Sequence, residues 1–292
     1  MTTLLVTGTS GHLGRLVVED LLARGVAPAD VVATARDTAA VADLAERGVD
    51  VRRADYDDPA TLTAAFAGVD RALLVSSTTD GDRVAQHRAV IEAAAAAGVE
   101  LLAYTGVVNA GRSTMLLAAD HQATETLLAS SGLSTVVLRN SWYHENWTDQ
   151  LADHLDRGAI VGSAGQGRVS AASRADYAAA AAAVLTDPDT STRVLELGGD
   201  TAFTLADLAA VISEVAGRPV AYQDVPVEQY TEILRGAGLP APVADVVADI
   251  DRGLSDGELE TTSGDLSRTI GRPTTPLRQV VQDAVARLSP TA

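Results

Sequence analysis

Short aliphatic and β-branched runs alternate with helical segments through the first half of the chain. Period and composition predict strands at residues 4–6, 31–35, 49–53, 72–75, 101–104 and 135–138. Between the strands they predict helices over residues 13–24, 39–46, 83–97 and 120–129. Strands separated by helices of this length form right-handed βαβ crossovers and a parallel sheet. The pattern therefore predicts the α/β class, with a Rossmann-type, doubly wound parallel sheet.

This alternation changes after Asn140. Further strands are predicted at residues 160–161 and 194–197, and a helix over 175–185. Residues 204–292 have a helical pattern that is interrupted by prolines at positions 219, 226, 240, 242, 273 and 276. We therefore expect a Rossmann domain over residues 1–140 and mainly a smaller, helix-rich C-terminal lobe over 141–292, with a segment near 170–200 returning to the main sheet. Because doubly wound folds bind ligands at the carboxyl edge of the sheet, the lobe is expected to cover the substrate there.

Glycines at positions 8, 11 and 14 follow the first strand and open the first helix. In a βαβ unit of about 30 residues this spacing is typical of a dinucleotide-binding turn. The first glycine permits the tight turn, the second lets the backbone approach a pyrophosphate, and the third allows close packing of helix on strand. The helix N-terminus then favours the phosphate charge. The predicted cofactor site includes Gly8, Thr9, Ser10, Gly11, His12, Leu13 and Gly14, although Ser10 has the alternative role of capping the helix.

The end of the second strand indicates which dinucleotide is bound. Sites that prefer NAD place an acidic residue there to accept hydrogen bonds from the ribose. This chain has Arg36 instead, which suits the 2′-phosphate of NADP(H). The neighbouring Asp37 has two alternative roles, because it can reach a ribose hydroxyl or pair with Arg36. The predicted cofactor is NADP(H).

Other strand ends supply further predicted cofactor contacts, each with a plain turn as the alternative. Asp55 and Tyr56 follow the third strand and are placed beside the adenine. Ser76 and Ser77 end the fourth strand, near the middle of the cofactor. Thr105 and Gly106 end the fifth strand, near the nicotinamide.

Composition limits the chemistry of the chain. A net charge of −17 argues against direct binding to nucleic acid or to an anionic membrane. The chain has no cysteine, and all 22 of its basic residues are arginine, which excludes disulfides, thiolate chemistry and every mechanism that needs a lysine amine. The five histidines show no metal-binding spacing, so no metal site is predicted.

The hydropathy pattern predicts a cytoplasmic protein. No apolar run of 18 residues occurs, and no charged segment precedes an apolar one at the start of the sequence. The alanine stretches at residues 93–97 and 178–183 are expected to form buried helices. A homodimer is compatible with the sequence, but no self-complementary face is evident.

Five stretches give the chain a family resemblance over nearly its whole length: residues 7–14, 52–56, 103–105, 138–146 and 172–177. The chain resembles the NmrA-like branch of the atypical short-chain dehydrogenases/reductases, and within it the bacterial type 2 NAD(P)H:quinone oxidoreductases. The Arg-Asn-x-Trp-Tyr-x-Glu-Asn run at residues 139–146 is more specific than the glycines. The resemblance implies an NADPH-binding Rossmann domain and reduction of quinone-like acceptors. It places Asn140, Trp142 and Tyr143 around the nicotinamide and the substrate, with Asn146 in the same run.

The chain departs from its superfamily at the proton-transfer site. Many members use a Tyr-x-x-x-Lys pair in which the lysine lowers the pKa of the tyrosine. Here Leu117 occupies the tyrosine position and His121 the lysine position. The predicted catalytic residues are His121, because an imidazole titrates in the right range, and Tyr143, a weaker acid. His121 has two alternative roles, which are to bind the nicotinamide ribose or to form a structural pair with Asp120 or Glu125.

Three functions fit these residues. The first is an NADPH-dependent oxidoreductase that transfers hydride to a quinone-like acceptor, which accepts hydride readily without the Tyr-Lys pair. The second is a redox-sensing regulator that binds NADP(H) without turnover. The third is a ketone reductase or alcohol dehydrogenase with another proton donor, so the expected partner is a small quinone or carbonyl compound.

Overall fold

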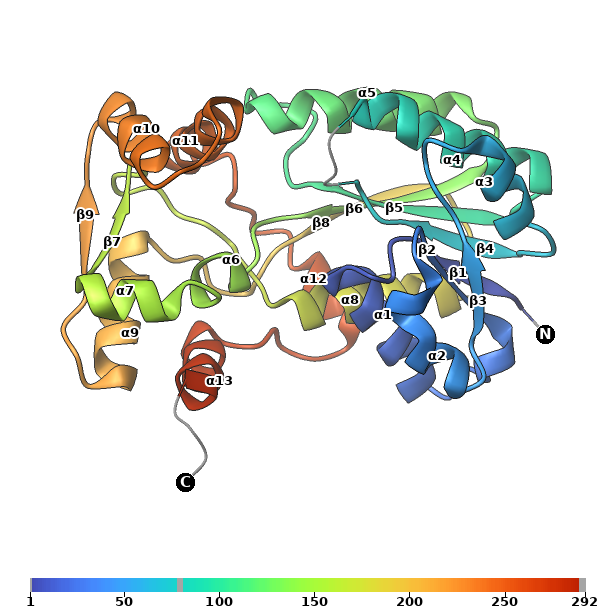
Figure 1. The fold of residues 1–292 in the computed structure, drawn as a ribbon, viewed down its shortest axis with the longest axis horizontal. Coiled ribbons are helices and arrows are strands. Elements are labelled where there is room, and N and C mark those ends of the chain that lie inside the picture. The colour runs from blue at the N-terminus through green and yellow to red at the C-terminus, as the bar shows by residue number, and fades with distance from the viewer. Residues whose placement is uncertain (1, 78–80, 289–292) are drawn as a thin grey trace. The chain divides into compact units, whose positions relative to one another are not determined.

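The chain forms two compact units, described for residues 2–77 and 81–288 by a computed structural model (Figure 1). The first unit comprises the residues up to Val107 together with 120–140 and 174–195. The second comprises residues 108–119, 141–173 and 196 onward. Each unit is therefore built from three separate segments. The functional division into a cofactor domain and a substrate lobe stays a prediction.

The first unit is organised around a seven-stranded sheet, in the order β3-β2-β1-β4-β5-β6-β8. Its strands are β1 (Leu4–Val6), β2 (Val31–Ala35), β3 (Asp50–Arg53), β4 (Arg71–Leu74), β5 (Leu101–Val107), β6 (Ser134–Asn140) and β8 (Arg193–Leu197). The pairings from β3 through β6 are all parallel. The strand order reverses between β1 and β4, which is where doubly wound folds bind ligands. The predicted fold class is confirmed.

Helices cover both faces of this sheet (Figure 1). They are α1 (His12–Ala23), α2 (Ala42–Glu46), α3 (Pro59–Ala65), α4 (Arg83–Ala97), α5 (Leu116–Ser130) and α8 (Arg174–Thr186), with short 3₁₀ turns at Pro28–Asp30 and Thr38–Val41. In Figure 1, α3, α4 and α5 lie over one face, and α1, α2 and α8 over the other. This double cover explains why every residue of β1 and β2 is buried and apolar or threonine. Helix α3 is not predicted by the sequence pattern.

The two alanine stretches differ in their burial. Residues 178–182 in α8 are at most 6 % exposed, and their small side chains let α8 pack closely against α1. Ala94 in α4 is buried, but Ala95 to Ala97 are exposed. The expectation of a buried helix is therefore wrong for most of residues 93–97, because that end of α4 lies at the surface.

The second unit is rich in helix. It contains α6 (Glu145–Thr148), α7 (Leu151–Arg157), α9 (Leu205–Ala216), α10 (Val227–Gly236), α11 (Ala241–Ser255), α12 (Asp265–Ile270), α13 (Leu277–Leu288) and the parallel pair β7 (Ala159–Gly162) and β9 (Ala221–Asp224). Strand β9 is not predicted by the sequence. Thr204 and Asp207 form a reciprocal capping box that starts α9. None of the described helices combines the length and apolar character that crossing a bilayer requires.

Candidate cofactor and active site

The glycine turn joins β1 to α1 and has the conformation that its spacing predicts. Gly8 has φ +64°, in the left-handed region that favours glycine. A Cβ atom on Gly14 would lie 2.5 Å from the carbonyl oxygen of Gly8 and 2.8 Å from that of Thr7. Helix α1 therefore reaches this close to the strand only because Gly14 has no side chain. The conformation of the turn is therefore set by its own backbone contacts at Gly8 and Gly14.

The first turn of α1 is left open by the side chains around it. Gly11 is the N-cap residue in an extended conformation, and no side chain caps the helix. The alternative role of Ser10 as the cap is therefore wrong, and Ser10, Gly11 and His12 are exposed. The backbone N–H and the hydroxyl of Thr9 both donate to the carbonyl oxygen of Thr34, each over 3.0 Å, which anchors the turn to β2. Uncapped amides at a helix N-terminus suit an anion.

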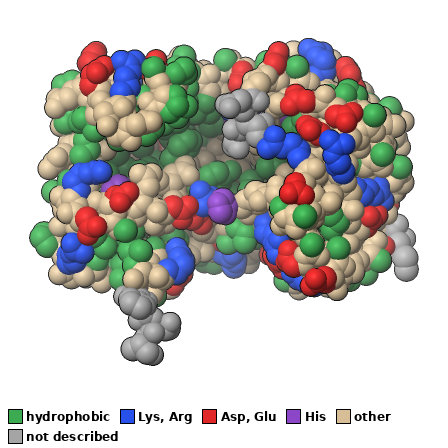
Figure 2. Space-filling model, in the orientation of Figure 1, with side chains coloured by type: hydrophobic (Ala, Val, Ile, Leu, Met, Phe, Trp, Pro, Cys, Tyr) green, Lys and Arg blue, Asp and Glu red, His purple; other side chains and the backbone are tan. Residues whose placement is uncertain are grey.

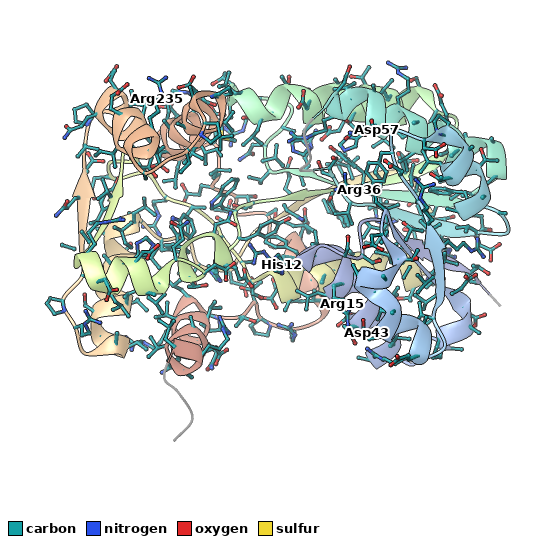
Figure 3. The ribbon with its side chains drawn as sticks, in the orientation of Figure 1. His12, Arg15, Arg36, Asp43, Asp57 and Arg235 are labelled. Carbon is teal, nitrogen blue, oxygen red and sulfur yellow. The ribbon has the colours of Figure 1, made fainter. Side chains whose placement is uncertain are left out.

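Arg36 lies at the end of β2 with its side chain exposed (Figure 3). Arginine and acidic side chains are interspersed on the surface in Figure 2, and many arginines are paired, as Arg15 is with Asp43. Arg36 makes no hydrogen bond or ion pair with any of the described residues. Asp37 instead accepts a hydrogen bond from the backbone N–H of Ala39 at 3.0 Å and caps a 3₁₀ turn. The alternative of an Arg36–Asp37 pair is therefore wrong, and the guanidinium is available to a ligand.

The two predicted adenine contacts serve the local structure. The side chain of Asp55 accepts a hydrogen bond from the backbone of Asp57 in the turn before α3. The Tyr56 hydroxyl donates to the carbonyl oxygen of Val75 at 3.0 Å and lies 2.5 Å from Oγ1 of Thr7. Burial raises the pKa of Tyr56, so the phenol stays neutral. The Tyr56 side chain is partly buried and packs against the core of the first unit, so its contact with the adenine stays a prediction.

The carboxyl ends of β4 and β5 are held together by side chains. The backbone N–H of Ser76 donates to Oγ1 of Thr105 at 2.8 Å. The backbone N–H of Ser77 donates to Nε2 of His87 at 3.1 Å, and Nδ1 of His87 lies 2.9 Å from Oγ1 of Thr124. Gly106, next along β5, is partly buried, and a Cβ there would make ordinary contacts. The structure therefore places Ser76, Ser77 and Thr105 in one cluster at the predicted nicotinamide end.

His121 belongs to the same cluster. Its Nδ1 atom lies 2.6 Å from the hydroxyl of Tyr104, and its side chain is 8 % exposed. The alternative of a structural pair with Asp120 or Glu125 is wrong, because Asp120 pairs with Arg83 and Glu125 pairs with Arg139.

The ionisation of His121 differs from the sequence-based expectation. Burial lowers the pKa of His121 to about 3, with further contributions from the positive Arg83 and from His87. The expectation that His121 titrates near neutral pH is therefore wrong, and its imidazole is neutral there. A neutral imidazole donates a hydrogen bond well, but it releases its proton poorly.

The Arg-Asn-x-Trp-Tyr-x-Glu-Asn run crosses from one unit to the other. Asn140 ends β6 in the first unit and is 4 % exposed. In the second unit, the backbone of Trp142 and Tyr143 pairs with that of Ala172. The backbone N–H of Asn146 donates to the carbonyl oxygen of Tyr143 at 3.1 Å. Trp142, Tyr143 and Asn146 are therefore gathered in one partly buried segment at the start of α6.

Sequence reasoning missed His87, Tyr104 and Thr124 as members of the site. The signal for His87 is its register in α4, where it shares a face with Val90, Ile91 and Ala94 at helical spacing and is 0 % exposed. A polar residue within an apolar stripe needs a buried partner. The partners come from β5 and α5, and a single sequence does not show which residues meet there.

The strand order and the glycine turn define a Rossmann-type α/β protein with an open helix N-terminus and an exposed arginine at the end of β2. Comparison with known proteins agrees. The NmrA-like family model matches residues 1–277, so the chain belongs to the NmrA-like family, as the resemblance in the sequence predicts. Among residues 2–77 and 81–288, no three acidic or histidine side chains form a group that would hold a metal ion.

Two relatives, one of them matched both in sequence and in structure, are similar over most of their length. Quinone oxidoreductase 2 of Escherichia coli K12 is 44 % identical over 276 residues, covering 94 % of this chain and 96 % of that protein. The crystal structure of the E. coli NADPH-dependent quinone oxidoreductase with NADPH superposes with a TM-score of 0.93 at 43 % identity, covering 96 % of this chain and 99 % of that one. The triphenylmethane reductase of Citrobacter sp. with NADP(H) has a TM-score of 0.92 at 37 % identity, covering 97 % and 100 %.

Proposed function

We propose that this protein is an NADPH-dependent oxidoreductase that reduces quinone-like acceptors. The observation that carries the proposal is the 44 % identity to a quinone oxidoreductase over 94 % of the chain. The exposed Arg36 and the uncapped start of α1 independently support NADPH, because they offer a guanidinium and backbone amides to phosphate groups.

Each part of the cofactor site has its own task. Gly8, Gly11 and Gly14 let the backbone of residues 8–14 approach the pyrophosphate, and Arg36 binds the 2′-phosphate. Ser76, Ser77, Thr105, Gly106 and Asn140 border the nicotinamide, and Trp142, Tyr143 and Asn146 contact the acceptor. Bound NADPH supplies the hydride, and solvent supplies the one further proton that a quinone needs to become a hydroquinone. Such an acceptor lowers the demand for a strong acid, which fits a chain without lysine.

His121 and Tyr143 are the two polar groups assigned to the acceptor. His121 is neutral in this structure, so its role is to donate a hydrogen bond rather than a proton. Tyr143 is the second candidate, and Tyr143→Phe tests it by removing the phenol hydroxyl alone. We further propose that the protein works in the cytoplasm on a small molecule, with a homodimer as its assembly.

Turnover of purified protein tests this function. NADPH oxidation is followed by the absorbance of the reduced nicotinamide, with a quinone, with a ketone, and with no acceptor. The proposal expects rapid oxidation with the quinone and little with the ketone. Oxidation with the ketone instead would replace the acceptor class, and tight NADPH binding without turnover on either would indicate a sensor.

A further inference from the structure

A buried chain of side chains connects α4, α5 and β5 in the first unit. It comprises His87, Thr124, Tyr104 and His121, and the first three are 0 % exposed. The rings of His87 and Tyr104 meet edge to face with centroids 5.4 Å apart. Rigid surroundings of this kind hold a side chain in one orientation.

The proton positions in this chain follow from its donors, starting at His87. The backbone N–H of Ser77 can only donate, so Nε2 of His87 accepts and carries no proton. Burial and Arg83 lower the pKa of His87 to about 4, so the neutral ring carries its one proton on Nδ1. That proton is donated to Oγ1 of Thr124 at 2.9 Å. The tautomer of His87 is thereby fixed.

The next hydrogen bond of this chain of side chains is formed by Tyr104. Burial raises the pKa of Tyr104, so the phenol keeps its proton. The hydroxyl of Thr124 donates its own proton to the carbonyl oxygen of Asp120 at 2.8 Å. The phenol oxygen lies 2.6 Å from Nδ1 of His121, the distance of a strong O–H···N hydrogen bond, so we assign the phenol proton to this contact. Since Nδ1 of His121 accepts, the single proton of the neutral ring lies on Nε2.

We propose that Tyr104 is a positioning residue that fixes His121 as the neutral tautomer with its proton on Nε2. Tyr104 is itself held in place by its contacts with Thr124 and His87. His121 then offers an N–H donor that stabilises negative charge on the acceptor oxygen during hydride transfer. This inference rests on the proposed function for its catalytic meaning, but the tautomer is a property of the protein alone.

The surroundings of His121 keep this state over the physiological pH range. The charged and titratable groups around it are Arg83 and His87 of α4, Tyr104 of β5, and Asp120 and Glu125 of α5. The two carboxylates are paired with arginines, so neither is available to stabilise an imidazolium. We therefore expect no titration of His121 between about pH 5 and pH 8.

Nitrogen NMR of the histidine rings in the intact protein tests the tautomer directly. We expect Nδ1 of His121 to be unprotonated and Nε2 protonated in the wild type, unchanged from pH 5 to 8. Tyr104→Phe keeps the ring and removes the hydroxyl, so the two tautomers should mix. Tyr222→Phe, which removes a hydroxyl that bonds Asp224 in the second unit, is the matched control and should leave the His121 signals unchanged.

Kinetics provide a second readout. A glutamine amide can place an N–H donor near the position of Nε2, so His121→Gln should keep kcat within about tenfold of the wild type. His121→Ala removes the donor and should lower kcat by about 100-fold. A proton on Nδ1 in the wild type, titration near neutral pH, or equal losses in the two variants would overturn the inference. Failure of quinone turnover would instead remove the proposed function, while the NMR result still decides the tautomer.

Discussion

The glycine turn with Arg36 and the buried cluster around His121 differ in the exposure and hydrogen bonding of their polar groups. At the turn, Arg36 is exposed and unpaired with any described residue, and α1 begins without a side-chain cap. In the cluster, the buried His87 is hydrogen-bonded to Thr124, and the buried Tyr104 to His121. The difference teaches that one region leaves its donors to a ligand, whereas the other uses its donors to hold a single group in place.

The largest effect is expected at the glycine of closest approach. Gly14→Ala would force α1 away from the strand, because the new Cβ would meet backbone that has no room to move. We expect a loss of about 3 kcal/mol in the free energy of unfolding, together with loss of NADPH binding. Denaturant unfolding measures the first and cofactor titration the second. Gly236→Ala in α10, where no atom lies within 4 Å of the new Cβ, is the control and should be neutral or slightly stabilising.

The buried histidines make the cluster sensitive to acid. The folded-state pKa values of His87 and His121, about 4 and about 3, lie below the ordinary value of 6.5. The folded state therefore binds fewer protons, so this stabilisation is complete above about pH 6.5 and decreases as the pH falls toward 4 for His87 and toward 3 for His121. We expect each histidine to contribute about 1–3 kcal/mol to this decrease. Unfolding measured at several pH values should show a shallower slope for His87→Gln; an unchanged slope would contradict the neutral cluster.

A substitution at Tyr56 distinguishes a structural role of its hydroxyl from a contact with the cofactor. Tyr56→Phe removes the donor to the Val75 carbonyl and should lower the free energy of unfolding by about 1 kcal/mol. Because the ring remains, NADPH affinity should change by less than about threefold (~0.6 kcal/mol). Thermal unfolding and cofactor titration measure the two effects. A large loss of affinity with unchanged stability would show that the hydroxyl serves the ligand instead.

The smallest effect on stability is expected at Ser10. The exposed Ser10 does not cap α1, so Ser10→Ala should leave the free energy of unfolding within about 0.5 kcal/mol of the wild type. NADPH affinity should fall a few-fold if the hydroxyl binds phosphate. Thr204→Ala, which removes a true cap from α9, should cost about 1 kcal/mol and calibrates the comparison.

The two regions also differ in how far the sequence predicts them. The glycine turn is predictable because it is formed by residues that are close together in the sequence. The positive φ of Gly8 and the close approach of α1 to the strand at Gly14 both follow from the spacing of the glycines after β1. The position of Arg36 is predictable for the same reason, since it directly follows the last residue of β2. The sheet is predicted because central strands such as β1 and β2 are buried on both faces and are therefore apolar or threonine throughout. Helix α3 and strand β9 are short, and their patterns are too weak to predict.

The cluster depends on residues that are distant in sequence. His87, Tyr104 and His121 meet only because α4 and α5 lie over the same face of the sheet that contains β5 (Figure 1), and no local pattern shows which side chains face each other. The protonation of His121 was predicted wrongly for this reason: an imidazole titrates near neutral pH in water, but burial beside Arg83 prevents it here. The predicted pairing of His121 with Asp120 or Glu125 is wrong for the same reason. Arginines that are distant in sequence, from α4 and β6, pair with these two carboxylates.

The central claim is that an unpaired Arg36 selects NADPH for quinone reduction, and kcat/KM for the two cofactors tests it most directly. With a saturating quinone, the wild type should prefer NADPH over NADH. Arg36→Ala should lower kcat/KM for NADPH by about 10- to 100-fold, as expected for loss of charged hydrogen bonds worth about 1.5–3 kcal/mol, and leave NADH nearly unchanged. Arg235→Ala, an ion-paired arginine of α10, is the control and should change neither value. Equal losses for both cofactors in Arg36→Ala, or no preference in the wild type, would contradict the account.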